Sequence, residues 1–488
     1  MCRRSRWAWA AALALASGCL PSLKDNPARD VRKELPGQFT AAALGEADGG
    51  VAEADNTGKK NWRDFFASPE LQSLIELALA NNQELNVRMQ EIVIAHAEVG
   101  ARRGEYLPKL GAGVGVGVEK VGEDTSQGAS DKANGLPVHL GNFTFGLRAS
   151  WEVDVWGKLR DAAKAADYRA LASVEARNFM VTQLVAEIAR SYYELIALDN
   201  QLDVLKRNIQ IQSDALEVVR QQKIAARVTE LAVQRFEAEV LKNRSRLYEL
   251  EQERVQTENR INFLVGRYPQ PVARNAGELS RPLPATLEAG LPSQLLENRP
   301  DVRQAELALE AAKLDVSSTR ARFYPALSID AEVGYGSFNI AHLLKTPESV
   351  LYNLMGNLTA PLLNRAAIEA DYRMANARQI QAVFDYERTL LQAFTDVATQ
   401  LVKYQNLQQS YSLRAQQVET LGRSVEASNV LFQAARADYM EVLMTRRDSL
   451  EAELELIETK KQLLLSMVNI YQALGGGWRS PAAEPQKG

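Results

Sequence analysis

An internal repeat constrains the fold of this 488-residue chain more than any other feature of its sequence. Segment 78–117 aligns with segment 295–334 at a constant offset of 217 residues. Farther along the chain the offset becomes 209, which pairs Gly266 with Gly475. Length alone would suggest about three unrelated globular domains, whereas this register predicts two copies of one structural unit. The predicted repeats are 62–267 and 291–478, joined by a proline-rich linker at 268–290.

Each repeat shows the same order of patterns: one helix, two strands, a very long helix and a closing helix. Only 7% of the residues are aromatic, and Ala, Leu, Gln, Glu and Arg fill long stretches, which indicates elongated helices. The first helix of each repeat ends before a proline, because proline cannot continue a helix. The predicted helices are 69–106, 156–226 and 228–265 in the first repeat, and 291–323, 363–434 and 437–473 in the second.

Four segments alternate between apolar and polar residues, which is the period of a β-strand with one apolar face. Four such strands cannot close a barrel by themselves, because closure needs about eight or more. We therefore expect oligomerisation to supply the remaining strands. The predicted strands are 110–118, 143–154, 327–335 and 351–360.

The N-terminus has the layout of a secretory signal peptide at residues 1–18, with three arginines before a short apolar run. Segment 15–19 resembles a bacterial lipoprotein cleavage box, which implies that Cys19 becomes the acylated first residue. The alternative is an ordinary signal peptide in which Cys19 has no role. Residues 19–61 carry no sustained periodicity and are predicted to be a tether, and 479–488 a flexible tail.

Composition and motifs exclude several classes of function. The net charge of −4 is too balanced for nucleic-acid binding, and two cysteines and three histidines offer no metal site of the usual kinds. The alternating glycines at 111–117 fit a strand better than a nucleotide loop, because no helix starts after them. No hydrolase or phosphate-binding motif occurs. We predict no enzyme activity, no metal and no cofactor apart from a covalent lipid on Cys19.

Four motifs together resemble the bacterial outer-membrane factor family, the TolC and OprM type of export channel, and within it the NodT-like lipoproteins. They lie at 151–160, 298–302, 323–325 and 471–478. The resemblance implies an α+β membrane protein whose three chains form a 12-stranded β-barrel, four strands each. A long periplasmic α-helical coiled-coil barrel would continue this barrel.

The resemblance also implies partners and a location. The homotrimer would lie in outer-membrane lipid, anchored by its own acyl chains and extending into the periplasm. It would be a passive conduit, engaged by a periplasmic adaptor and a proton-driven inner-membrane pump. Two alternatives remain: the duct of a type I protein-secretion system, and a lipid-anchored periplasmic coiled-coil scaffold. The scaffold does not explain four strands with an apolar face.

The turns between the long and closing helices, near 226–230 and 435–441, are the predicted periplasmic tips. The family usually has glycine at each tip, where this chain has Ala226 and Ala435. By resemblance, Asp438 and Glu441 are candidates for an acidic gate. Their spacing equally predicts a helix start, with Asp438 as the N-cap. The candidate adaptor contacts are Ala226, Arg227, Thr229, Glu230, Ala435 and Arg436.

Overall fold

The structure is a computed structural model. The residues that it describes are 21–23, 26–32, 35, 36, 39, 56–282, 288–363, 365–434 and 436–479. The chain forms two compact units, one built mainly from Ile92–Ala172 and Ala305–Tyr386, the other mainly from Ser173–Gln304 and the segment after Glu387. None of the described helices is both long enough and apolar enough to cross a membrane.

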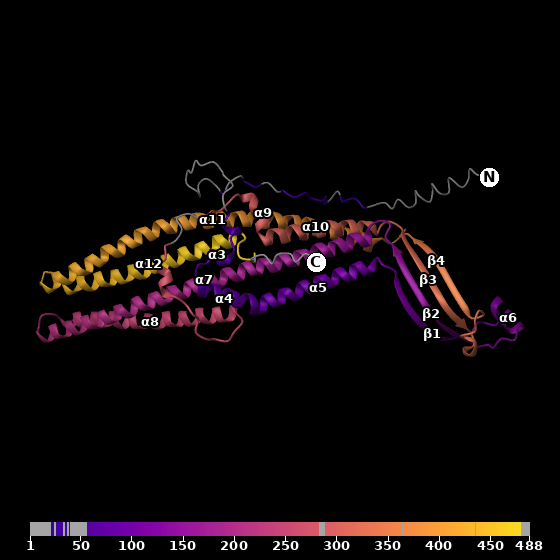
Figure 1. The fold of residues 1–488 in the computed structure, drawn as a ribbon, viewed down its shortest axis with the longest axis horizontal. Coiled ribbons are helices and arrows are strands. Elements are labelled where there is room, and N and C mark those ends of the chain that lie inside the picture. The colour runs from indigo at the N-terminus through magenta and orange to yellow at the C-terminus, as the bar shows by residue number, and fades with distance from the viewer. Residues whose placement is uncertain are drawn as a thin grey trace. The chain divides into compact units, whose positions relative to one another are not determined.

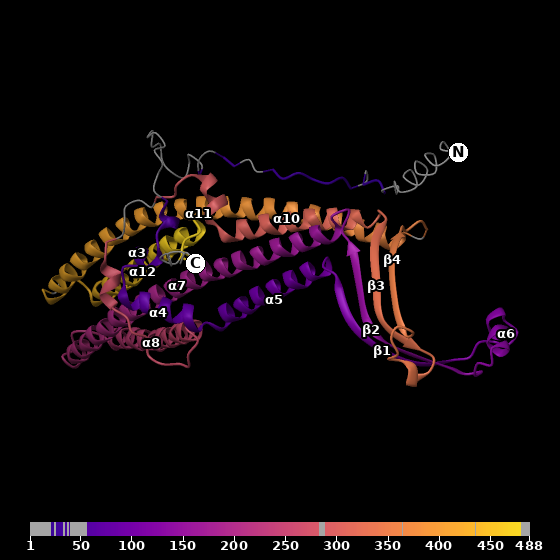
Figure 2. The same cartoon turned by 45° about the vertical axis from the view of Figure 1, so that its right-hand side comes forward.

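The first unit contains one antiparallel sheet whose four strands lie in chain order, and Figure 2 shows them side by side in a curved layer. All four predicted strands are confirmed. In this sheet β1 and β4 are the two outer strands. The strands are β1 (Lys109–Glu119), β2 (Leu140–Val153), β3 (Ala326–Ser337) and β4 (Val350–Thr359).

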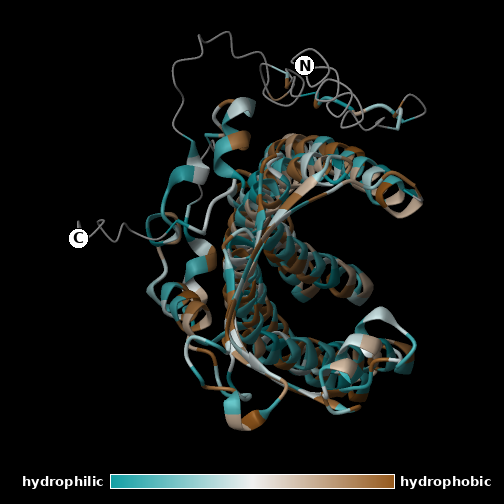
Figure 3. Ribbon diagram, turned by 90° about the vertical axis from the view of Figure 1, so that its right-hand side faces the viewer, coloured by the Kyte–Doolittle hydropathy of each residue, from teal (hydrophilic) through white to brown (hydrophobic). Residues whose placement is uncertain are grey.

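The register gives the sheet two faces of opposite character. Val114 lies opposite Phe145, and Phe145 opposite Tyr335, so apolar residues share one face. On the other face Arg148 pairs with Glu332, and its Nε donates to Glu332 Oε1 over 2.9 Å. Figure 3 colours the ribbon by hydropathy, and both hydrophilic and hydrophobic residues occur in the strands. The apolar face is open, since Val114 retains 74% of its exposure in the single chain.

Between β1 and β2 the chain forms a short helix, α6 (Ser126–Ala133), which the sequence patterns did not predict. Thr125 caps it, because its side chain accepts a hydrogen bond from the N–H of Gly128 over 3.1 Å. A helix of eight residues is too short to show a recognisable periodicity in the sequence.

Polar and aromatic side chains hold the passage from strand to helix after β2. Asp154 accepts hydrogen bonds from the N–H groups of Leu159 and Arg160 at 3.2 and 2.9 Å, at the start of the next helix. The Trp156 indole donates to the carbonyl of Pro325 over 2.8 Å, which ties the first repeat to the second. The segment that carries the family resemblance at 151–160 thus has a local structural role.

The long and closing helices begin and end within three residues of the predicted bounds. They are labelled in Figure 1. The long helices are α7 (Lys158–Ile224) and α11 (Ala366–Gln433), and the closing helices are α8 (Glu230–Leu264) and α12 (Tyr439–Ala473).

The first helix of each repeat was predicted as one piece, and this is wrong in both repeats. Asn82 and Arg299 adopt extended backbone angles, which interrupts each helix at repeat-equivalent positions. Asn82 is held by a distant contact, since its Nδ2 donates to the carbonyl of Leu264 over 2.9 Å. Arg299 precedes Pro300, which disfavours helical angles in the residue before it. The pieces are α4 (Pro69–Asn81) and α5 (Gln83–Glu105), and η3 (Pro292–Gln294), α9 (Leu295–Asn298) and α10 (Pro300–Ala321).

A glycine packs against each of these interruptions. Gly266 and Gly475 follow the closing helices with φ of 71° and 82°. A Cβ at Gly266 would lie 2.4 Å from the carbonyl oxygen of Asn81, and one at Gly475 would lie 2.4 Å from that of Asn298. The positive φ and the lack of room for a Cβ both require glycine at these two positions. The closing helix of each repeat therefore ends in the same way.

The core of the second unit is rich in buried tyrosines. Tyr192 is fully buried, and its hydroxyl donates to Glu278 and lies 3.0 Å from the Ser68 hydroxyl. Tyr471 stacks on Phe65 with 4.1 Å between ring centroids. Three short helices border this core: η1 (Thr57–Lys59), α3 (Trp62–Phe65) and η2 (Ala276–Ser280). A fourth short helix, η4 (Ile340–His342), lies between β3 and β4.

In the first unit, the segment of the predicted tether that contains Asn26 and Arg29 packs along α11. The Asn376 amide donates to the carbonyl of Asn26 over 2.8 Å, and the Gln379 amide to that of Arg29 over 3.1 Å. The Arg29 guanidinium lies 4.2 Å from the centroid of the Phe384 ring. This segment therefore follows the surface of a helix.

We expect Gly475→Ala to destabilise the protein by more than about 2 kcal/mol, because the new Cβ meets backbone atoms and the residue must keep a positive φ. The measurement is the thermal unfolding midpoint by circular dichroism. Gly422→Ala is the matched control, since a Cβ there meets nothing within 4 Å and alanine favours the helix. A midpoint for Gly475→Ala equal to that of Gly422→Ala would contradict this packing.

Candidate functional site at the helix hairpin tips

The first hairpin tip joins α7 to α8 through a left-handed residue. Ala226 has a φ of 53°. The N–H of Arg227 donates to the carbonyl of Gln222 over 2.9 Å, which is the closing bond of a Schellman-type helix end. This position favours glycine, and alanine there costs about 1 to 2 kcal/mol. Ala226, which stands where the family usually has glycine, is therefore a strained residue.

The second tip repeats the backbone of the first. The N–H of Arg436 donates to the carbonyl of Leu431 over 2.8 Å, the same six-residue closure. The N–H of Glu441 donates to the carbonyl of Asp438, and the N–H of Ala232 to that of Thr229, both over 3.1 Å. Ala435, the second predicted tip alanine, lies outside the described residues. The described residues of the two tips thus share these backbone hydrogen bonds and differ in their side chains.

Asp438 occupies the N-cap position of α12, as the helix-start interpretation predicts, but its side chain accepts no capping hydrogen bond. Thr229 has the same position before α8 and also makes no side-chain cap. Asp438 and Glu441 are both exposed. Their carboxylates are therefore available to solvent or to another chain, and a gate formed by them stays a prediction.

An ion pair ties the first tip together. Lys223, in the last turn of α7, pairs with Glu230 in the first turn of α8. Glu230 is thus already engaged, whereas Arg227 beside it is exposed. The repeat-equivalent of Glu230 is Tyr439, which cannot form the corresponding ion pair at the second tip.

An apolar cluster of α7 and α8 lies beneath the tips, and it includes the buried side chains of Leu216, Val233 and Phe236. Tyr439 and Leu443 of α12 pack against it. The two hairpins are therefore in direct contact within the second unit.

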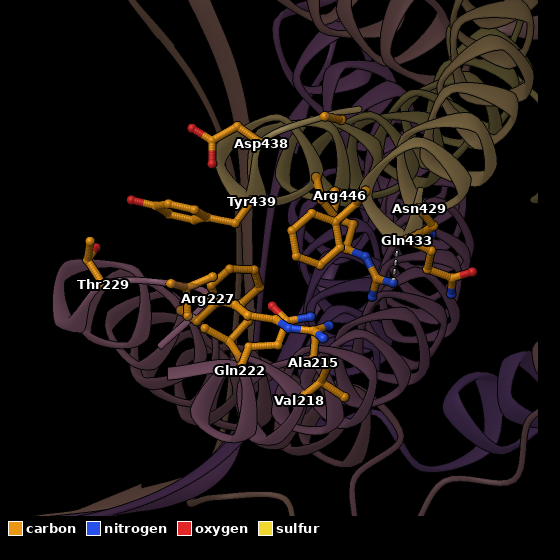
Figure 4. Close-up of a pocket in the computed structure, with 16 residues that line it drawn as sticks. Ala215, Val218, Gln222, Arg227, Thr229, Asn429, Gln433, Asp438, Tyr439 and Arg446 are labelled. Carbon is orange, nitrogen blue, oxygen red and sulfur yellow. Dashed lines mark hydrogen bonds between the residues drawn. The ribbon is translucent and has the colours of Figure 1, made fainter. Parts of the chain in front are cut away.

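The hairpins also enclose a cleft of about 570 Å3, drawn in Figure 4. Val219, Phe236 and Val442 supply part of its apolar lining, and Arg227 and Arg446 supply cationic groups. Sequence reasoning missed Arg446, because nothing in the spacing of an Arg-Arg pair on a long helix indicates which arginine faces another hairpin.

Two further predictions concern Cys19 and metal binding. Cys19 lies outside the described residues. Within the part of the chain that the structure describes, no group of three or more His, Cys, Asp or Glu side chains could hold a metal ion.

The chain matches the family model described as outer membrane efflux protein over residues 74–267 and 291–476. It is similar to pyoverdine export outer membrane protein OpmQ of Pseudomonas aeruginosa, with 30% identity over 473 residues that cover 96% of this chain and 97% of the relative. It is also similar to cation efflux system protein CusC of Escherichia coli, with 28% identity over 469 residues, 96% of this chain and 98% of the relative.

Solved structures have the same fold. A crystal structure of CusC superposes with a TM-score of 0.78 at 25% identity and covers 92% of this chain and 99% of its own. The open state of the Neisseria gonorrhoeae MtrE outer membrane channel superposes with a TM-score of 0.78 at 24% identity and covers 95% and 99%.

We expect Ala226→Gly to stabilise the first tip by about 1 kcal/mol, because glycine removes the cost of the left-handed conformation. Hydrogen exchange of the Arg227 amide should slow by roughly fivefold. Ala225→Gly is the control, since Ala225 has no positive φ and should show no such gain. Equal effects of the two substitutions would show that Ala226 carries no strain.

Proposed function

The chain belongs to the outer membrane efflux protein family and is an outer-membrane channel of a tripartite efflux system; we propose that a periplasmic adaptor contacts its two hairpin tips and joins it to a proton-driven inner-membrane pump. The channel itself is a passive duct for small molecules and performs no catalysis. It needs no metal or cofactor. The energy and the choice of cargo come from its partners.

The sheet is the observation that carries this function. Its four strands have an open apolar face and a polar face, and the sheet ends at β1 and β4. Three chains join such sheets into one 12-stranded barrel, which pairs every edge strand. The apolar faces then meet lipid, while groups such as Arg148 and Glu332 line an aqueous interior.

The adaptor contact is proposed for both tips. Exposed side chains at each tip stand on closely similar backbones, so one kind of partner element fits both. The residues proposed to meet the adaptor are Ala226, Arg227, Thr229, Glu230, Ala435 and Arg436.

The gate is proposed at the second tip. Asp438 and Glu441 are exposed, and the Asp438 side chain is not used as a cap. In a trimer each acid would form a ring of three like charges, which would favour bound cations and oppose close approach unless they are screened.

Conductance in planar bilayers tests both the duct and the gate. We expect the wild-type trimer to conduct weakly, and the double variant Asp438→Asn with Glu441→Gln to conduct several-fold more and to lose block by divalent cations. Asparagine and glutamine keep the shape and hydrogen bonding of the acids, so thermal stability should not fall.

The two outcomes are separable. Equal conductance and equal cation block in wild type and double variant would refute the gate alone. No conductance from correctly assembled trimers of either protein would refute the duct. Glu451→Gln, an exposed acid farther along α12, is the control and should behave as wild type.

We also propose that Cys19 is acylated, and chain length supports this. Asn26 contacts Asn376, which lies ten residues, or roughly 15 Å, along α11 from its start at Ala366. The seven residues from Cys19 to Asn26 span at most about 25 Å. An acyl chain on Cys19 can therefore reach the end of α11 that follows the membrane strands.

Mass spectrometry of the mature N-terminus should find a diacylglyceryl, N-acylated Cys19. Cys19→Ser should abolish the modification and leave unprocessed precursor, because the acylated cysteine is the first mature residue. Cys2→Ser changes the other cysteine and should leave the product unchanged. An unmodified mature N-terminus would refute acylation.

A further inference from the structure

The cleft at the tips combines an apolar lining with a half-buried cationic group. Phe236 and Val442 are 3% and 6% exposed, and both line it. Val218 also lines the cleft and is 54% exposed, so the cavity is open on the α7 side. The cleft is therefore a half-covered site and not a packing defect within the core.

Arg446 of α12 holds a guanidinium in this cleft without an acidic partner. Its Nη2 donates to Asn429 Oδ1 over 2.9 Å, as the dashed line in Figure 4 shows. Its Nε is buried and has no hydrogen-bond acceptor. No carboxylate among the described residues forms an ion pair with it.

Two other arginines that are partly or fully buried, Arg274 and Arg299, are neutralised by carboxylates. Burial disfavours the charged form of Arg299, but Asp301 and Asp396 outweigh burial and raise the pKa of its guanidinium. Burial likewise opposes the charge of Arg274, and two carboxylates raise its pKa. At Arg446 burial acts alone and lowers the pKa. An arginine nevertheless stays protonated, so the cleft contains an uncompensated positive charge.

The remaining charges of the cleft do not supply the missing anion. Arg227 adds a second cation. Asp438 is the one acid in the lining, and Figure 4 shows it on the side of the cleft away from Arg446. The site therefore lacks a carboxylate that could reach the guanidinium.

We propose that the tip cleft is a receptor for an acidic side chain, flanked by apolar ones, on a peptide segment of the periplasmic partner. The carboxylate accepts hydrogen bonds from Arg446, and the flanking side chains cover Phe236 and Val442. Charge complementarity selects this occupant, since a carboxylate neutralises the guanidinium of Arg446 through charge-assisted hydrogen bonds. The inference rests on the proposed adaptor contact and specifies one interaction within it, an ion pair between Arg446 and an acidic side chain of the adaptor.

The test uses the full-length channel in cells that contain its pump and adaptor. p-Benzoylphenylalanine at position 218 should crosslink to the adaptor, and mass spectrometry then identifies the acidic residue nearest the crosslink. Arg446→Glu should reduce co-purification of the adaptor by at least about 30-fold. Exchange of the identified acid for arginine should restore co-purification with Arg446→Glu.

Arg447→Glu is the matched control, because Arg447 is exposed, adjacent in sequence and paired with Asp448. It should change co-purification by less than twofold. Each variant must remain a trimer, and Arg446→Gln serves where Arg446→Glu does not assemble.

Three results would overturn the inference. If Arg446→Glu or Arg446→Gln retains the adaptor as wild type does, the cleft is not the receptor, although the duct proposal stands. If position 218 crosslinks to a second copy of this chain, the cleft belongs to the trimer interface. If wild type itself retains no adaptor, the proposed adaptor contact fails, and the inference fails with it.

Discussion

The open apolar face of the sheet is the constraint on which the rest of this structure depends. Side chains such as Val114 and Leu354 keep about three quarters of their exposure in the single chain. Such a face is unstable in water, and the outer strands β1 and β4 leave backbone groups that need partners. Lipid covers the face, and neighbouring chains pair the edges. The fold is therefore complete only as a trimer in a membrane.

Within the second unit, each repeat is closed by a backbone contact that matches the one in the other repeat. The first helices are interrupted at Asn82 and Arg299, and the glycines after the closing helices pack against the residues just before these breaks. Gly266 and Gly475 do so with similar angles and the same closest distance. Because backbone meets backbone there, either repeat tolerates little change at this position.

The tips show the opposite behaviour, since the backbone is repeated while the chemistry has diverged. Thr229 corresponds to Asp438, and Glu230, which pairs with Lys223, corresponds to Tyr439. Turn geometry depends on backbone hydrogen bonds, so side chains can change without altering it. The second hairpin has exposed acids at Asp438 and Glu441, and Arg446 is a cation inside the cleft.

The repeat, the four strands and the long helices could all be predicted from the sequence, because period, proline and glycine signals act within a few residues of each other. The tertiary structure alone decided features that join distant residues. Asn82 interrupts a helix by bonding to Leu264, and the segment near Asn26 lies on α11 through Asn376. Likewise, a local pattern placed Asp438 at a helix start, but whether its side chain caps that helix was settled by the conformation of the turn. The environment of Arg446 depends on two hairpins about 200 residues apart in sequence, and no local pattern encodes their contact.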